Sequence, residues 1–212
     1  MDLYIRENYL KKIRGFYHAD DLIKVITGVR RSGKSSLMQM IADELKSSGI
    51  PESQIIYVGL DKREYRNVVT ADKLEALIMS KCVTDEMKYL FIDEVQNVKD
   101  FETVLNGFRT EGNWSIFITG SNSYLLSGEL VTKLTGRYIE FEIFPLNFQE
   151  YEGMKAFFGK PINSNPMIEL TNYILEGGFP RAILFDDMAD KRKYVQGVVS
   201  EIFEKDIRKR LK

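Results

Sequence analysis

Short apolar runs alternate with amphipathic stretches over the first part of the chain. Segments rich in Ile, Val, Tyr and Phe, each bounded by polar or glycine-containing residues, are typical of buried strands; they are Leu22–Thr27, Gln54–Val58, Lys88–Asp93, Ser115–Thr119 and Tyr138–Phe144. Between them, Ser35–Ser48 has apolar residues at helical spacing and ends before Gly49. Asp100 fits the N-cap of a further helix that starts at Phe101. This alternation predicts a mostly parallel sheet with helices on both faces.

The pattern changes after Pro145, where strand-like runs stop and helical spacing dominates. Glycine and proline separate the helical stretches, which are Leu146–Phe158, Pro166–Glu176 and a long segment from about Asp187. Lys160–Asn165 has the composition of a turn or short linker. We therefore expect an α/β core over residues 1–145 and a small helical unit over residues 146–212.

Composition narrows the setting of the protein. The 212 residues include 30 basic and 31 acidic side chains and carry a net charge of −1, which gives no bulk electrostatic reason to expect binding to nucleic acid or an anionic membrane. The single cysteine, Cys82, excludes an internal disulfide, and His18 is the one histidine, so a histidine-based metal site or a Ser-His-Asp triad is excluded. With no signal peptide and no long apolar run, we expect a soluble, cytoplasmic protein.

Residues 28–35 read Gly-Val-Arg-Arg-Ser-Gly-Lys-Ser and match the phosphate-binding pattern G-x-x-x-x-G-K-[ST] between a predicted strand and a predicted helix. Glycines let successive N–H groups point into a concave anion site, and the following helix adds its positive N-terminal dipole. Lys34 is predicted to reach the β- and γ-phosphates and the Ser35 hydroxyl to bind Mg²⁺. The predicted nucleotide contacts are Gly28, Arg31, Ser32, Gly33, Lys34, Ser35 and Ser36. The alternative is a glycine turn that matches by chance, and loop arginines often face solvent.

A second motif fits the first. Residues 89–94 read Tyr-Leu-Phe-Ile-Asp-Glu, an apolar strand that ends in two carboxylates. A phosphate-loop enzyme holds its magnesium with an acidic residue at such a strand end, so Asp93 is the predicted metal ligand. Glu94 is the predicted general base that polarises the attacking water, and its place directly after Asp93 favours an ATPase over a nucleotide kinase or a GTPase. The alternative is a strand that ends in a charged turn.

Several phrases carry a family resemblance. The two motifs and the polar strand end at residues 119–122 look like the AAA+ superfamily. More narrowly, GVRRSGKSSL, FIDEVQNV, FITGSNSYLLS, LTGRYIEFEIFPLNFQEY and GGFPRA resemble a prokaryotic family of uncharacterised AAA ATPases, related to the archaeal signal-transduction (STAND-like) ATPases. The resemblance covers nearly the whole chain, most strongly Ile26–Arg181. It implies an α/β P-loop NTPase core of the AAA+ type, with strand order 5-1-4-3-2, followed by a helical lid.

The resemblance also implies three further site residues or pairs. Ser121 or Asn122 takes the position of the sensor on strand four, whose side chain is aimed at the γ-phosphate or the attacking water; a simple turn is the alternative. Pro180, in a Gly-Phe-Pro element, takes the place of the lid proline that packs on adenine. The alternative is a lid turn without ligand contact. Arg137 takes the position of the arginine finger, against a solvated charge at a strand start.

In the implied strand order, Arg137 enters strand five at the edge opposite the phosphate loop. A side chain of limited reach would not touch the γ-phosphate of its own subunit from there. We therefore expect Arg137 to act in trans, on a neighbouring subunit, which makes a homo-oligomer the expected assembly.

The function that these motifs favour is Mg-ATP binding and hydrolysis by a molecular switch or small motor, with ATP or ADP and Mg²⁺ as ligands. A regulatory module that holds ADP and turns over slowly needs the same phosphate cradle and stays an alternative. A small-molecule kinase is a further alternative, although Glu94 argues against it and no segment resembles an acceptor site.

The apolar stripe of the last predicted helix continues toward Lys205–Lys212 without a glycine stop or a proline breaker. Proteins of the resembled family carry a further C-terminal domain, nuclease-like in outline. We therefore expect this chain to be part of a longer protein, in which the lid continues into a domain outside these residues.

Overall fold

The structure, a computed structural model, describes residues 3–120, 134 and 136–208. The chain divides into two compact units. One consists of Glu7–Thr27 and Lys34–Glu142 and contains most of the sheet; the other consists of Met1–Arg6, Gly28–Gly33 and Ile143–Lys212 and is mainly helical. We call them the sheet unit and the helical unit and describe each by itself.

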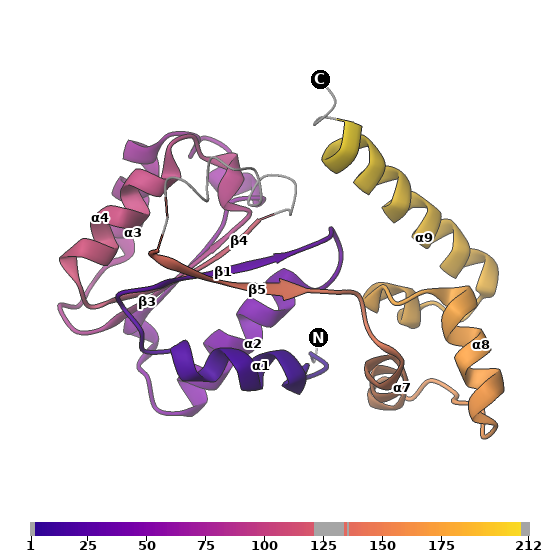
Figure 1. Ribbon diagram of the computed structural model, residues 1–212. Helices are drawn as coiled ribbons and strands as arrows, with labels where there is room; N and C mark the ends of the chain where they lie inside the picture. Colours follow the sequence, from indigo (N-terminus) through magenta and orange to yellow (C-terminus); the bar gives the residue numbers. More distant parts are fainter. Residues whose placement is uncertain (1–2, 121–133, 135, 209–212) are drawn as a thin grey trace. The chain divides into compact units, whose positions relative to one another are not determined.

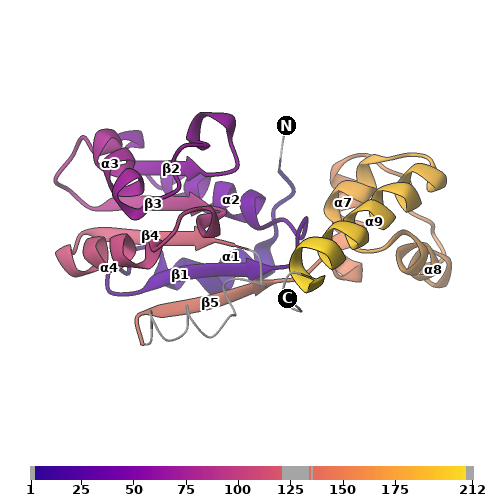
Figure 2. The same cartoon turned by 90° about the horizontal axis from the view of Figure 1, so that it is seen from above.

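The sheet has five strands in the order β2-β3-β4-β1-β5, which are β1 (Ile23–Gly28), β2 (Ile55–Gly59), β3 (Lys88–Asp93), β4 (Trp114–Thr119) and β5 (Tyr138–Ile143). This order is the expected 5-1-4-3-2 read from the other edge, so the predicted fold class is confirmed. The pairs β2–β3, β3–β4 and β4–β1 are parallel, with Leu90 opposite Ile116 and Val25 opposite Ile118. Figures 1 and 2 show β5 beside β1 at one edge.

Helices cover both faces of the sheet (Figures 1 and 2). α1 (Glu7–Ile13) and α2 (Lys34–Ser47) lie on one face, and α3 (Ala71–Lys81) and α4 (Phe101–Glu111) lie on the other. Every residue of β1, β3 and β4 is buried, as expected for parallel strands that are covered on both sides. The core beneath α3 and α4 joins apolar side chains of strands and helices, including Val25, Val58, Leu74, Ile78, Ile92, Leu105, Phe108 and Ile118.

Asp100 does not cap α4 in the way its sequence position predicts. The helix starts at Phe101, but the Asp100 backbone is left-handed, with φ 56°, and its side chain makes no capping hydrogen bond. A capping side chain acts from an extended backbone. The Asp100 carbonyl instead accepts hydrogen bonds from the backbone N–H and the hydroxyl of Thr103.

One lysine is buried inside the sheet unit. Lys24, the second residue of β1, is fully inaccessible to solvent, and its Nζ donates to Ser115 Oγ at 2.9 Å and to the Leu22 carbonyl at 3.1 Å. Burial lowers the pKa of Lys24 to about 7, because the charged ammonium loses its hydration.

The helical unit has three main helices, and each starts at a side-chain cap. α7 (Phe148–Phe157) begins after Asn147, which forms a capping box with Glu150. α8 (Pro166–Glu176) begins with proline at N1 after Asn165, whose side chain accepts a hydrogen bond from the Met167 N–H. α9 (Met188–Ile202) begins after Asp187 and continues into a π-helical turn, Phe203–Ile207. Between α8 and α9, Pro180–Leu184 form a 3₁₀ helix.

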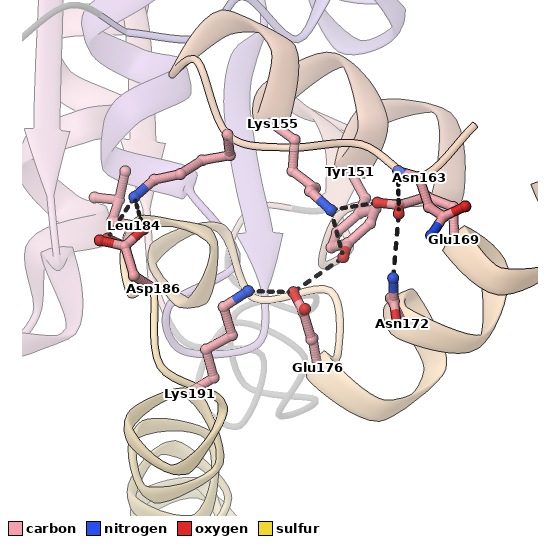
Figure 3. Close-up of polar contacts among 10 residues, drawn as sticks. Tyr151, Lys155, Asn163, Glu169, Asn172, Glu176, Leu184, Asp186 and Lys191 are labelled. Carbon is pink, nitrogen blue, oxygen red and sulfur yellow. Dashed lines mark hydrogen bonds and ion pairs between the residues drawn. The ribbon is translucent and has the colours of Figure 1, made fainter. Parts of the chain in front are cut away.

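Buried ion pairs hold α8 in this unit. Figure 3 shows that Lys155 of α7 contacts Glu169, and that Lys191 of α9 contacts Glu176 with 2.6 Å between Nζ and Oε2. The Tyr151 hydroxyl links the two pairs by donating to Glu176 at 2.9 Å. Glu169 is 0% exposed, whereas apolar side chains on the outer face of α8 are 47–70% exposed; these are Met167, Ile168, Ile174 and Leu175. α8 therefore has charges on its inner face and apolar groups on its outer face.

The change of pattern in the sequence predicts a boundary between the α/β core and the helical unit after residue 145. The helical unit starts close to that position, at Ile143, but it also includes Met1–Arg6 and Gly28–Gly33. The membership of these two segments depends on long-range contacts, which sequence spacing alone does not reveal.

The buried Lys24 predicts a specific pH dependence. The pKa of Lys24 is about 7 in the folded chain and 10.5 in the unfolded chain. At a pH between these two values, the chain therefore takes up a proton when it unfolds. The free energy of unfolding of the wild type therefore rises with pH from about 7 to 9, by at most about 1.4 kcal/mol per pH unit from this group. We expect Lys24→Met to remove this contribution, as measured by urea denaturation at half-unit pH steps. Equal slopes for the two proteins would show that Lys24 titrates normally.

Candidate functional site

The loop that follows β1 has the backbone geometry of an anion site. Gly28 has φ 144° and Gly33 has φ 106°, and Arg31 between them is also left-handed, with φ 66°. A β-carbon on Gly28 would lie 2.2 Å from the Ile143 carbonyl oxygen, so no other residue fits there. The Ser32 hydroxyl is buried and, among the described residues, has no hydrogen-bond partner. Such a curled loop with an unsatisfied buried hydroxyl fits an oxygen-rich ligand.

A buried arginine from the N-terminal segment holds this loop. Arg6 is 4% exposed, and its Nη1 donates to the carbonyls of Ser32 and Phe144, both at 3.0 Å. Its Nε and Nη2 form a bidentate pair with Glu150 at 3.0 and 2.7 Å. Glu150 also accepts a hydrogen bond from the Asn147 N–H at the start of α7. One guanidinium group therefore joins the N-terminal segment, the loop and the start of α7.

The contact between Arg6 and Ser32 also orients a donor. A trans peptide directs its carbonyl and the following N–H in opposite directions. Because the Ser32 carbonyl points to Arg6, the Gly33 N–H points away from Arg6. Sequence analysis did not identify Arg6, because a lone arginine near a chain end carries no motif.

Pro180 lies beside the same loop. Its Cγ is 4.0 Å from the position that a β-carbon of Gly33 would occupy. Both residues belong to the helical unit. The role of Pro180 as a lid proline that packs on adenine stays a prediction.

The two loop arginines face carboxylates of the C-terminal helix. Arg30 Nε donates to Asp206 Oδ1 at 3.1 Å, and Arg31 Nη2 lies 3.8 Å from Glu201 Oε2. The sequence raised two alternatives for these arginines, phosphate contact or exposure to solvent. The structure shows a third arrangement, in which both are paired within the helical unit.

In the sheet unit, α2 begins at Lys34, directly after the loop. The Lys34 side chain is buried, Ser35 is exposed and Ser36 is half-buried. An exposed hydroxyl in the first turn of this helix is placed where a ligand can reach it, at the positive end of the helix dipole.

The predicted acidic pair lies at the end of β3 and is held by the neighbouring strand. Asp93 is buried, and the hydroxyl of Thr119, the last residue of β4, donates to its carboxylate. The same Thr119 oxygen accepts the Glu94 N–H at 3.0 Å. Glu94 has a left-handed backbone, with φ 59°, and its half-buried carboxylate accepts a hydrogen bond from the Gln96 amide. Thr119 therefore positions both acids.

The sequence contained a signal for Thr119. It is the polar end of a buried strand, and parallel neighbours finish at the same edge of a sheet. The family resemblance instead implied a sensor role for Ser121 or Asn122. Both of these lie outside the described residues.

These side chains suit magnesium. Mg²⁺ prefers oxygen ligands, keeps several waters and needs only one or two protein carboxylates in addition to phosphate oxygens. Asp93 and the Ser35 hydroxyl supply such oxygens in the sheet unit. In the described part of the chain, no group of three or more His, Cys, Asp or Glu residues could hold a metal alone, so an ion here would depend on ligands from nucleotide and water.

Arg137 lies at the far end of this unit from the acidic pair. It is exposed and precedes β5, and its carbonyl accepts the N–H of Ile23, the first residue of β1. β1 is six residues long, which corresponds to roughly 17 Å from its start to the beginning of the loop. Within the sheet unit, Arg137 is therefore not brought together with Asp93 and Glu94.

Comparison with known proteins identifies related sequences. A family model described as an AAA domain matches residues 20–152. An uncharacterised protein of Haemophilus influenzae is 38% identical over 206 residues, which cover 95% of this chain and 50% of that protein. An uncharacterised protein of Methanocaldococcus jannaschii is 36% identical over 191 residues, covering 87% of this chain and 42% of that protein. The chain spans half or less of the length of these relatives.

Solved structures share the fold. The structure of AMPPCP-bound DnaA from Aquifex aeolicus superposes with a TM-score of 0.53 at 20% identity, covering 99% of this chain and 67% of that chain. A Saccharomyces cerevisiae Hsp104:casein complex gives a TM-score of 0.56 at 15% identity, covering 87% of this chain and 36% of that chain. At these identities the likeness concerns the fold alone. Across the residues that the structure describes, no helix has the length and apolar character needed to cross a membrane.

The anchoring role of Arg6 makes a testable prediction. Arg6→Lys keeps the charge but loses the planar fork that serves Glu150 and the loop carbonyls together. We expect the free energy of unfolding to fall by about 1–3 kcal/mol in a urea titration followed by circular dichroism.

Arg14 offers a matched control, because it also forms a paired guanidinium contact, with Glu7 and Glu44, but at the exposed surface. Arg14→Lys is expected to match the wild type within error. Equal losses in the two variants would contradict an anchoring role of Arg6.

Proposed function

Because this chain belongs to the AAA domain family, we propose that it binds Mg-ATP, hydrolyses it with water, and acts as a molecular switch or small motor. The observation that carries this proposal is the Thr119 hydroxyl, which bonds Asp93 and the Glu94 backbone at once. A charged turn at the end of a strand needs no such shared partner. A metal ligand next to a general base needs both carboxylates held in place.

The phosphates would bind in the loop 28–33 and at the start of α2. Gly28 and Gly33 allow the backbone to curl, and Ser32 and Ser36 add hydroxyl groups near the helix start. Lys34 supplies a point charge for the terminal phosphates. Arg31 is a further candidate, on the condition that it leaves Glu201.

Asp93 and Ser35 would hold the magnesium ion, which, when bound, neutralises the charge that develops on the phosphate oxygens. Glu94 would accept the proton of the attacking water. The hydrogen bond from the Gln96 amide fixes the Glu94 carboxylate without supplying a positive charge. Glu94 therefore has the freedom to act as a base once a nucleotide is in place.

Pro180 would contribute an apolar surface to the base of the nucleotide, because it lies next to Gly33 of the loop. Arg137 would act on the nucleotide of a neighbouring subunit. Its position directly before β5, away from the acidic pair of its own sheet unit, supports this assignment, and guanidinium suits the task because it grips two phosphate oxygens at once.

A test of the proposed function separates binding from chemistry. Glu94→Gln keeps the shape of the side chain and removes the basic carboxylate. We expect this variant to bind Mg-ATP as the wild type does and to hydrolyse it about 10²–10⁴-fold more slowly.

Lys34→Ala is the companion variant, and we expect it to lose affinity for ATP in isothermal titration calorimetry. Hydrolysis by Glu94→Gln at the wild-type rate would exclude Glu94 as the base. A wild type that binds ADP and releases almost no phosphate in a single-turnover assay would instead identify the slowly hydrolysing regulatory module.

A mixing experiment tests Arg137. Arg137→Ala and Lys34→Ala are each expected to be inactive. Mixed subunits place an intact phosphate loop opposite an intact arginine, and a trans-acting arginine is worth about 10³–10⁵ in rate. We therefore expect phosphate release to recover in the mixture. A mixture that co-assembles in light scattering but stays inactive would show that Arg137 is a surface charge.

A further inference from the structure

The end of the C-terminal helix supplies carboxylates to the two arginines of the phosphate loop. Asp206 accepts a hydrogen bond from Arg30 at 3.1 Å and is only 13% exposed, while Glu201 faces Arg31 at 3.8 Å. The loop and these carboxylates belong to the same compact unit. The pairs are therefore a property of the helical unit itself.

A change of helix type helps to bring the two carboxylates to one side. An α-helix places residues four apart on a common face, but Phe203–Ile207 form a π-helical turn with hydrogen bonds between residues five apart. Residues 201 and 206 are five apart and span most of this turn. π turns are rare and occur frequently at functional sites.

The loop attracts anions of any kind. It carries Arg30 and Arg31, followed by Lys34, and residues 28–36 contain no acidic side chain. A guanidinium group grips phosphate in the same bidentate way as carboxylate. The carboxylates of the helix and the phosphates of a nucleotide would therefore compete for the same two arginines.

We propose that Glu201 and Asp206 form a carboxylate latch, which holds Arg30 and Arg31 until the phosphates of a bound nucleotide take over these arginines, so that occupancy of the loop releases the end of the C-terminal helix. This inference rests on the proposed nucleotide binding. It adds a direct link between nucleotide binding at the loop and the end of the C-terminal helix.

The neighbourhood of Glu201 suits reversible release. Lys205 Nζ lies 2.6 Å from Glu201 Oε1, on the same helix. The Lys205 ammonium holds the pKa of Glu201 below its usual value, with smaller contributions from Arg31 and Arg30. Glu201 therefore stays ionised and keeps a partner when Arg31 leaves.

The first test looks for a gain in affinity for ADP, which damage to the fold would not produce. In Glu201→Gln/Asp206→Asn, Arg30 and Arg31 lose these two competing carboxylates. We expect ADP with magnesium to bind roughly 3- to 10-fold more tightly than to the wild type in isothermal titration calorimetry, the range set by partly exposed ion pairs. A purely structural role of the pairs would leave the affinity unchanged or weaken it.

The matched control changes the same charge on the same helical segment. Glu204 pairs with the exposed Arg208, and Asp190 is an exposed residue in the first turn of α9. We expect Asp190→Asn/Glu204→Gln to bind ADP as the wild type does. An equal gain of affinity in this control would assign the effect to net charge and overturn the latch.

The second test follows the helix. Hydrogen exchange of residues 199–207 in the wild type is expected to become faster when ADP and magnesium are added, because the carboxylates lose their arginine partners. In Glu201→Gln/Asp206→Asn this exchange is expected to be fast from the start and insensitive to ADP.

Wild-type exchange that stays unchanged or slows on saturation with ADP would overturn the latch. So would a latch variant that binds ADP no more tightly than the wild type. Absence of ADP binding in every variant, the wild type included, would contradict the proposed function and the latch with it.

Discussion

The helical unit depends on the single guanidinium group of Arg6. This group donates two hydrogen bonds to Glu150 and one each to the carbonyls of Ser32 and Phe144. Burying a charge is favourable only when its donors are satisfied in this way, so the segments around Arg6 are constrained together. The conformation of the phosphate loop is therefore set by a residue that lies far upstream of the motif.

The polar groups of the site are organised by the geometry of parallel strands. Strands β3 and β4 run in the same direction, so their last residues, Asp93 and Thr119, meet at one edge of the sheet. The buried apolar residues before them make this edge rigid. The strands thus supply a fixed platform, and chemistry is confined to the residues that follow the last hydrophobic position of each strand.

Hydrophobic spacing predicted the five strands of the described residues, because buried parallel strands are continuous apolar runs of distinctive composition. The strand order followed from the family resemblance. The places of the glycine loop between β1 and α2 and of the acidic pair at the end of β3 were also predictable, since each is a contiguous motif, and the ligands of both stay a prediction. Arg6 and the partners of the loop arginines were not, because their roles depend on segments that are distant in sequence. Thr119 could be recognised as the polar end of a buried strand, but its contacts with Asp93 and Glu94 could not. Asp100 was assigned a capping role from its residue type, while its left-handed backbone prevents that role.

The charged inner face of α8 affects how the stability of its attachment depends on temperature. Burial of apolar surface produces a positive heat-capacity change on unfolding, whereas burial of polar surface contributes with the opposite sign. The sheet unit is held by apolar burial, so its stabilisation weakens on cooling. α8 is held by the packing of Tyr173 on Phe148 and Tyr151 and also by ion pairs of Glu169 and Glu176. These ion pairs gain relative strength as temperature rises and the hydration of charges becomes less favourable. The attachment of α8 is therefore expected to follow a different stability curve from the core of the sheet.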